Sequence, residues 1–281
     1  MRCFCPRERS PRAGVTWGTS MSFMRTSNPA LNENVFRNAA TSAGVLAPPE
    51  RMTLVGTINR TGILVLLALL TAAWPWMTYF KTVTPENALG DPGVVFPWMI
   101  GGAIGGLICA IALMFKKEWA PFLAPAYALL EGLFLGGISA MYQAKYAGIV
   151  VQAVGLTLFT LVALLLVYRS GLIKVTDNFR IGVMAATGGI ALLYLVGFVL
   201  SFFGKAIPYI HESGLIGIGF SLLVVVIASM NLVLDFDFIE RGAESGAPKY
   251  MEWFAAFGLM VTLVWLYLEF LRLLSKLNSR K

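Results

Sequence analysis

Few ionisable side chains lie inside the long apolar runs of this sequence, and these residues are the ones that could do chemistry. Glu131 stands near the middle of one run, in the segment YALLEGLFLGG. A charged side chain at the centre of a membrane helix costs roughly 2.5–3.5 kcal/mol. One interpretation is a protonated carboxyl group that donates a hydrogen bond to a neighbouring helix; the other is a proton or cation ligand in a water-filled cavity. Both interpretations of Glu131 stay open.

A second group of charged residues closes a later apolar run, in LDFDFIERG. Asp235 and Asp237 are two residues apart, and helix positions two apart point about 200° away from each other. We therefore expect one aspartate to face the bundle and the other to face the lipid headgroups. Arg241 follows Asp237 by four residues and is placed to pair with it along the helix, where it could act as a latch. The alternative is a solvated helix end without a further role.

The remaining candidate acids lie near the ends of the last apolar run. Glu269 precedes Arg272 by three residues, which is the spacing of an ion pair along a helix. Glu252 opens the run beside Lys249, where a carboxylate suits the positive N-terminal end of a helix. The single histidine, His211, lies in a loop and is predicted to be solvated.

The composition identifies the kind of protein that must position these residues. The chain has 281 residues, of which 57% are hydrophobic and 13% charged, whereas soluble domains are about one quarter charged. The net charge of +7 indicates an asymmetry between two membrane faces and no nucleic-acid partner. Cys3, Cys5 and Cys109 form neither a disulfide framework nor a zinc site. The sequence therefore predicts a polytopic membrane protein in a lipid bilayer, with no cofactor and no metal centre.

A membrane helix needs about 20 mostly apolar residues, and seven runs of this kind follow residue 55. They are Thr61–Phe80, Val94–Phe115, Trp119–Tyr142, Gly148–Tyr168, Ile181–Phe203, Gly214–Leu234 and Met251–Leu274. Helix is the expected state, because every backbone amide in lipid needs an internal partner. We predict an all-α bundle of seven transmembrane helices over residues 56–281.

Residues 1–55 are polar and lack the apolar core of a secretory signal. They predict a largely disordered N-terminal leader, within which Met21 or Met24 is an alternative start. The Lys and Arg residues outside the spans divide 15 to 7 in favour of the N-terminal side, so we expect a cytoplasmic N-terminus. Seven full spans put the basic tail outside, unless the last segment re-enters.

Three segments resemble the Bax inhibitor-1/YccA-like family of seven-helix membrane proteins. Glu131-Gly-Leu-Phe-Leu-Gly is similar to the family's third span, Asp235 with the Ile-Glu turn that follows is similar to the end of its sixth, and Leu266-Tyr-Leu-Glu-Phe-Leu-Arg is similar to its last helix. The resemblance covers about residues 55–277. The leader segment Arg25-Thr-Ser-Asn-Pro-Ala-Leu is similar to a bacterial branch, which implies the inner (plasma) membrane.

The resemblance implies a bundle wrapped around its last helix, and a pH-sensitive calcium leak governed by paired acids in the sixth and seventh spans. Asp235 matches the first acid. Glu269 lies 34 residues later, too far to be level with it across a helical hairpin. The level positions are expected at residues 256–259, where no side chain ionises, so Glu269 is a doubtful match and the pair is expected to be missing.

Two functions remain after this comparison. The first is a pH-sensitive leak or channel regulator for calcium or protons, with Asp235 as the mouth acid, Glu131 as a mid-membrane site, Asp237 as an auxiliary and Arg241 as a latch. Calcium would bind only weakly or transiently, because it needs more oxygen ligands than these acids supply. The second is a non-transporting protein that modulates membrane proteases or other membrane proteins. The motifs of intramembrane proteases are absent from the sequence, so we do not expect an enzyme.

Overall fold

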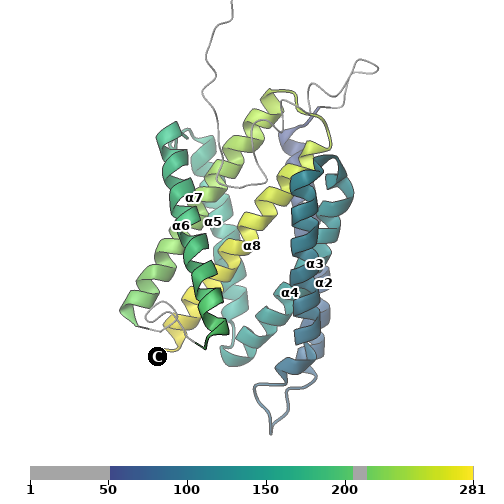
Figure 1. The fold of residues 1–281 in the computed structure, drawn as a ribbon, viewed down its shortest axis with the longest axis vertical. Helices are drawn as coiled ribbons and strands as arrows, with labels where there is room; N and C mark the ends of the chain where they lie inside the picture. Colours follow the sequence, from purple (N-terminus) through teal and green to yellow (C-terminus); the bar gives the residue numbers. More distant parts are fainter. Residues whose placement is uncertain (1–50, 205–213, 281) are drawn as a thin grey trace, which may run out of the picture.

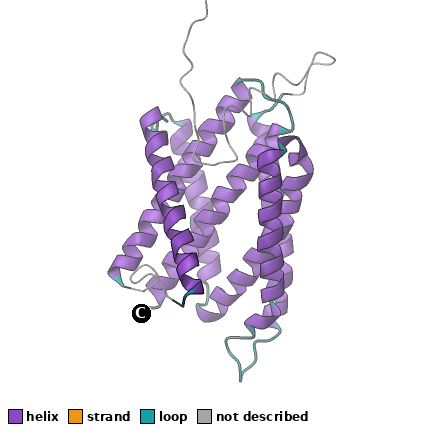
Figure 2. Cartoon of the chain, in the orientation of Figure 1, coloured by secondary structure: helices purple, strands orange, loops and turns teal. Residues whose placement is uncertain are grey.

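The computed structural model describes residues 51–204 and 214–280, and within them it confirms the seven-helix bundle (Figures 1 and 2). The helices are α2 (Leu54–Phe80), α3 (Phe96–Phe115), α4 (Ala120–Lys145), α5 (Ile149–Arg169), α6 (Asp177–Phe202), α7 (Leu215–Glu244) and α8 (Met251–Asn278), with short 3₁₀ turns η1 (Pro92–Val94) and η2 (Lys117–Trp119). All seven are long and apolar enough to cross a membrane. Residues 1–50 of the predicted leader, and His211, lie outside the described residues.

The last of these helices, α8, lies inside the bundle. Figure 1 shows it running diagonally between α3 and α4 on one side and α5, α6 and α7 on the other. It packs against α7, α2, α5 and α4, and most of its side chains are buried, including Phe254, Met260, Leu266 and Leu271. In α6, by contrast, most described side chains are accessible. The arrangement is the wrapped last helix that the family resemblance implies.

The helices alternate in direction, which defines two ends of the bundle. We call the end where α2 begins the N-terminal side, and the end where α2 finishes the far side. The turns α3–α4, α5–α6 and α7–α8 lie on the N-terminal side. Backbone contacts tie the start of the described chain to the last of these turns: Met52 N–H donates to the Ala247 carbonyl at 2.7 Å, and Arg51 forms an isolated antiparallel bridge with Pro248.

The backbones of α2 and α4 approach each other closely. A Cβ atom added at Gly136 would collide with the backbone of Ala72, and one at Gly132 would collide with Ala68 and Thr71. Glycine at these two positions lets the backbones touch, in the manner of small-residue contacts between membrane helices.

Two helix boundaries differ by seven or more residues from those expected from the apolar runs. The sixth span was expected to end at Leu234, yet α7 continues for ten more residues to Glu244. Asp235 and Asp237 therefore lie within the helix and not at its end. A helix of 30 residues is about 45 Å long, longer than the hydrocarbon core, so its polar last turns can continue beyond lipid depth. The first span was expected to begin at Thr61, but α2 begins at Leu54 and so contains Arg60.

Candidate functional site

Asp235 of α7 is buried against the central helix. Its side chain is 3% exposed, and its Oδ2 accepts a hydrogen bond of 2.6 Å from the hydroxyl group of Thr262 in α8. Within the described residues, this hydroxyl is its one hydrogen-bond partner. Asp235 precedes the end of α7 by nine residues and Thr262 follows the start of α8 by eleven, so both lie about 15 Å from the N-terminal side.

Thr262 is therefore the residue of α8 that lies level with Asp235. The prediction that residues 256–259 would lie there was wrong by about one helical turn. The reason is that α7 runs straight on to Glu244 before the chain turns, which moves the pairing register along α8. Glu269 lies seven residues beyond Thr262, about 10 Å further along the axis. In the described part of the chain, no second acid contacts Asp235.

Asp237 faces α6 and is buried, with 9% exposure, so the expectation that one aspartate faces the headgroups was wrong. Its Oδ2 accepts 2.7 Å from Nη2 of Arg180, and its Oδ1 lies 3.0 Å from Nη2 of Arg241. The ion pair between Asp237 and Arg241 confirms the prediction made from their four-residue spacing. Arg180, itself 5% exposed, is the partner that the sequence did not reveal. We call these three residues the Asp237 triad.

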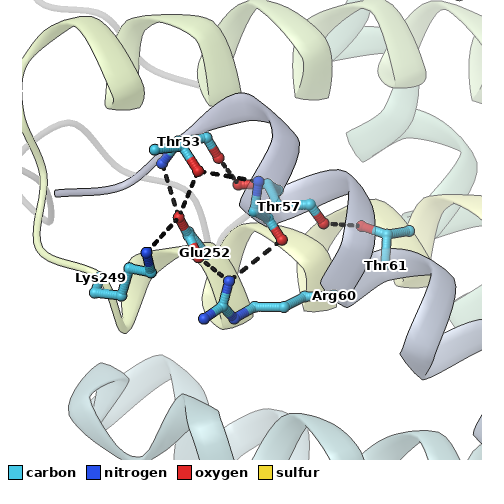
Figure 3. Close-up of polar contacts among 7 residues, drawn as sticks. Thr53, Thr57, Arg60, Thr61, Lys249 and Glu252 are labelled. Atoms are coloured by element: carbon cyan, nitrogen blue, oxygen red, sulfur yellow. Dashed lines mark hydrogen bonds and ion pairs between the residues drawn. The ribbon is translucent and has the colours of Figure 1, made fainter. Parts of the chain in front are cut away.

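A polar cluster around the buried carboxylate of Glu252 joins α2 to the start of α8 (Figure 3). The carboxylate of Glu252 is fully buried and forms an ion pair with Arg60. Its Oε1 accepts from the backbone N–H and the hydroxyl group of Thr53, at 2.8 and 2.9 Å. Lys249 lies 3.9 Å away. A Cβ atom at Gly56 would overlap the carboxylate of Glu252. The glycine therefore lets this carboxylate lie directly against the backbone of α2.

Neither Arg60 nor Thr53 was a candidate from the sequence. Arg60 directly precedes the first apolar run and was counted only among the basic residues of the N-terminal side, so the one available signal was its position at the edge of a span. Next to this cluster, Tyr250 lies in the turn just before α8. Burial, and secondarily the carboxylate of Glu118, raise the pKa of its phenol group, so Tyr250 stays neutral at physiological pH.

Glu269 lies towards the far side of α8 and is 1% exposed. Its Oε1 accepts from Nη1 of Arg272 and from the hydroxyl group of Tyr194 in α6, both at 2.9 Å. The ion pair with Arg272 confirms the three-residue spacing. The second oxygen, Oε2, is buried and has no hydrogen-bond partner among the described residues.

Glu131 lies between α4 and α3. Its Oε2 lies against the backbone of Gly106 in α3, where the ring of Tyr127, one turn earlier on α4, also packs. The hydrogen bond to a neighbouring helix, one of the two interpretations of this residue, is not found in the described part of the chain. The structure does not bring Glu131 into contact with Asp235, although both lie about 15 Å from the N-terminal side.

Around α8, the buried acids therefore occupy three levels. Glu252 lies at the N-terminal side, Asp235 meets Thr262 ten residues further along, and Glu269 lies seven residues beyond. These levels correspond to steps of about 15 and 10 Å along the helix axis. Arg60, Arg180 and Arg272 come within ion-pair distance of Glu252, Asp237 and Glu269 respectively. Asp235 lacks such a cation in the described residues.

These features define a polytopic membrane bundle with buried acids around a central helix. The profile of the Bax inhibitor 1 like family matches residues 28–279, and the protein belongs to this family. No curated protein and no solved structure matches the chain.

Proposed function

We propose that the protein is a non-enzymatic, pH-sensitive leak for protons or small cations, and that Asp235 is its titrating group. The observation that carries the proposal is the burial of an Asp235 side chain that is bonded to a neutral hydroxyl group. Because no cation neutralises the Asp235 carboxylate in the described residues, the gain or loss of its proton changes the net charge inside the bundle. Gain or loss of that charge would then control passage along α8.

In this proposal Glu252, Asp235 and Glu269, which lie at three levels around α8, are the sites at which a proton binds along the path. Their spacing of about 10–15 Å exceeds a hydrogen bond, so transfer between them requires intervening water. Tyr267 and Ser139, whose hydroxyl oxygens are 2.6 Å apart, add polar groups between the levels of Thr262 and Glu269. Glu131 would be a lateral proton site on the α3–α4 side of the bundle.

A proton suits this path better than calcium. Calcium takes six to eight oxygen ligands, and no group of three or more His, Cys, Asp or Glu side chains lies together in the part of the chain that the structure describes. Calcium would therefore pass through weak or transient contacts and would not be bound tightly. We place the leak in the inner (plasma) membrane with its N-terminal side in the cytoplasm, following the excess of Lys and Arg on that side.

The latch in this proposal is the Asp237 triad. Arg241 and Asp237 belong to α7, and Arg180 belongs to α6. The Arg180–Asp237 ion pair holds the two helices together at the N-terminal side, close to Asp235, and Arg241 competes for the same carboxylate from within α7. Arg241 is the partly exposed member, with a side chain 34% accessible, so it is the one that can leave the pair at the least cost.

The test is flux through proteoliposomes loaded with a pH dye or a calcium dye, at pH 6 and pH 8. The variants are Asp235→Asn and Glu131→Gln, and the matched control is Asp91→Asn, an exposed loop aspartate. We expect wild-type flux to depend on pH and Asp235→Asn to remove most of that dependence, while the control behaves as wild type.

Flux from folded wild-type protein that is no greater than from empty liposomes would overturn the leak. The alternative would then be a non-transporting protein that acts on membrane proteases or other membrane proteins. A stoichiometric membrane partner that co-purifies with the chain would support that alternative.

A further inference from the structure

A cavity of about 570 Å³ lies at the far side of the bundle, with walls formed by α3, α4, α6, α7 and α8. Lys145 and Ser279 line its outer part, since they stand at the far-side ends of α4 and α8. Tyr194 is the described lining residue furthest from a far-side helix end. It precedes the end of α6 by eight residues, or about 12 Å along the axis. The cavity therefore reaches inward as far as Tyr194.

Tyr194 and Arg272 separate this cavity from Glu269. Both residues line the cavity, whereas Glu269 is not among its described lining residues. The Tyr194 hydroxyl group and Nη1 of Arg272 each donate to Oε1 of Glu269 at 2.9 Å. The guanidinium carbon of Arg272 also lies 4.8 Å from the centre of the Tyr194 ring, which is a cation–π contact. The ring and the guanidinium group thus form a layer between the cavity and the carboxylate.

The second oxygen of Glu269 shows what this layer excludes. Oε2 is buried and bonds to no described residue, on a side chain that is 1% exposed. A buried polar atom without a partner is unfavourable, and a water molecule is a common way to satisfy it. The unpartnered Oε2 therefore favours any rearrangement that admits water from the cavity.

One helical turn deeper, the same face of α6 is apolar and closed. Ile190 precedes Tyr194 by four residues and is 6% exposed. It packs with Val224 and Ile227 of α7 in a small hydrophobic cluster. The change from open cavity to closed interior therefore coincides with the Tyr194 ring.

The helix that carries Tyr194 is attached to the bundle by polar contacts at regular intervals. Arg180, Thr187 and Tyr194 each bond to a polar side chain of α7 or α8. They are seven residues apart, which is about two helical turns, so they lie on one face of α6. This helix packs mainly against α7, and most of its described side chains are accessible. Among the helices around the cavity, α6 can therefore shift with the least loss of packing.

We propose that Tyr194 and Arg272 form a gate that closes the inner end of the far-side cavity over Glu269. The structure shows the closed state, and release of the Tyr194 hydroxyl group with a small shift of α6 opens Oε2 to cavity water. Because Arg180 lies on the same face of α6, one helix carries a residue of the latch and a residue of the gate. The closure itself stands on these contacts alone, whereas the proton as cargo rests on the proposed function.

The experiment measures how fast a small cationic methanethiosulfonate reagent modifies cysteines on either side of the gate. It uses the purified full chain in detergent micelles, with Cys3 and Cys5 replaced by serine and Cys109 by alanine. Ser275→Cys places a reporter on the cavity wall, and Ile190→Cys places one behind the gate. Reaction at these two positions distinguishes access to the cavity from access to the interior.

The gate variants are Tyr194→Phe and Arg272→Gln. Tyr194→Phe removes only the hydroxyl group that bonds to Glu269 and keeps the ring, so it does not enlarge the cavity by truncation. The matched control is Tyr146→Phe, which makes the same change at a residue that lines the cavity and has no hydrogen bond to Glu269. Thermal midpoints of all variants check that faster modification does not come from unfolding.

We expect Ser275→Cys to react in every background and Ile190→Cys to react slowly in the wild type. Each gate variant should speed the Ile190→Cys reaction about tenfold, as expected for the loss of one hydrogen bond to a charged group, and Tyr146→Phe should leave it unchanged. An Ile190→Cys rate that is the same in Tyr194→Phe and Tyr146→Phe would overturn the gate, even if Arg272→Gln folds poorly.

Flux through proteoliposomes separates the gate from the leak. If the leak exists, Tyr194→Phe also raises flux. Faster Ile190→Cys modification in Tyr194→Phe, with no flux from any variant, would support the gate and overturn the leak. Wild-type flux that Tyr194→Phe leaves unchanged, together with unchanged modification, would overturn the gate and retain the leak.

Discussion

The hydroxyl group of Thr262 donates a 2.6 Å hydrogen bond to Asp235, which stands 27 residues earlier in the chain. A neutral donor thus occupies the place opposite the buried acid of α7. Two facing carboxyl groups would titrate in two separated, coupled steps. A single carboxyl group beside a hydroxyl group titrates once, so any pH response centred here has one step.

Thr262→Asp is expected to convert this single acid into a facing pair. Since two carboxylates at this distance repel each other, the pair holds one proton until the pH rises, and loss of that proton pushes α7 and α8 apart. Flux in proteoliposomes should then rise more steeply between pH 6 and pH 8 than in the wild type. Thr262→Asn is the control, because asparagine is nearly the same size as aspartate but carries no charge. A Thr262→Asp profile that matches the Thr262→Asn profile would contradict the proposed position of the pair.

Breaking the Arg60–Glu252 ion pair should destabilise the bundle strongly. Arg60→Met leaves the fully buried Glu252 carboxylate without its main cation, and removal of one partner of a buried pair costs about 3–5 kcal/mol. The double variant Arg60→Met/Glu252→Gln should cost less than the sum of the two single changes. Unfolding in a denaturing detergent measures all three.

The control for this cycle is Lys249→Gln. Lys249 is 3.9 Å from Glu252, and its side chain is 40% exposed, so its removal should cost less than about 1 kcal/mol. Strictly additive effects of Arg60→Met and Glu252→Gln would show that the two side chains do not interact.

Within the Asp237 triad, Arg180 should contribute more to stability than Arg241. The Arg180 side chain is 6% exposed and spans the gap to α6, whereas Arg241 is 34% exposed and pairs along its own helix. We expect Arg180→Gln to cost about 3 kcal/mol and Arg241→Gln about 1 kcal/mol or less. If the triad is the latch, both variants also raise flux at pH 8. Unchanged flux in a folded Arg180→Gln protein would remove the latch from the proposal.

Gly136→Ala should separate α2 from α4. The added methyl group meets the backbone of Ala72, which cannot move as a side chain can, and overpacking of this kind costs about 1–3 kcal/mol. Gly101→Ala is the matched control on α3, because a Cβ atom there meets no other atom within 4 Å, and its effect should be neutral or stabilising by up to about 1 kcal/mol. Equal thermal midpoints for the two variants would contradict the close contact.

The sequence predicted those parts of the fold and site that depend on local spacing. Apolar runs located all seven long helices of the described residues, because membrane helices need an uninterrupted apolar length. The pairs Asp237–Arg241 and Glu269–Arg272 followed from helical periodicity. Each of these predictions uses residues within one helix.

The partners that cross between helices were not predictable in this way. Thr262 opposite Asp235, Arg180 opposite Asp237 and Tyr194 opposite Glu269 depend on how far each helix extends and how it is rotated about its axis. The end of α7 at Glu244, in place of the expected end at Leu234, moved the partner of Asp235 from residues 256–259 to Thr262. Thr and Tyr are also common residue types, so their presence in a span does not by itself mark them as partners of a buried acid.

The central position of α8 also has a consequence for biosynthesis. This helix follows the six other described helices in the chain, so it leaves the ribosome after them and yet fills the space between them. Until it arrives, the faces of α2, α4, α5 and α7 that contact α8 are unfilled, and Arg60 of α2 has not yet met Glu252. The contacts of α2 with α4 can form before α8 is made, whereas the helices that face α8 reach their final packing only once α8 has inserted.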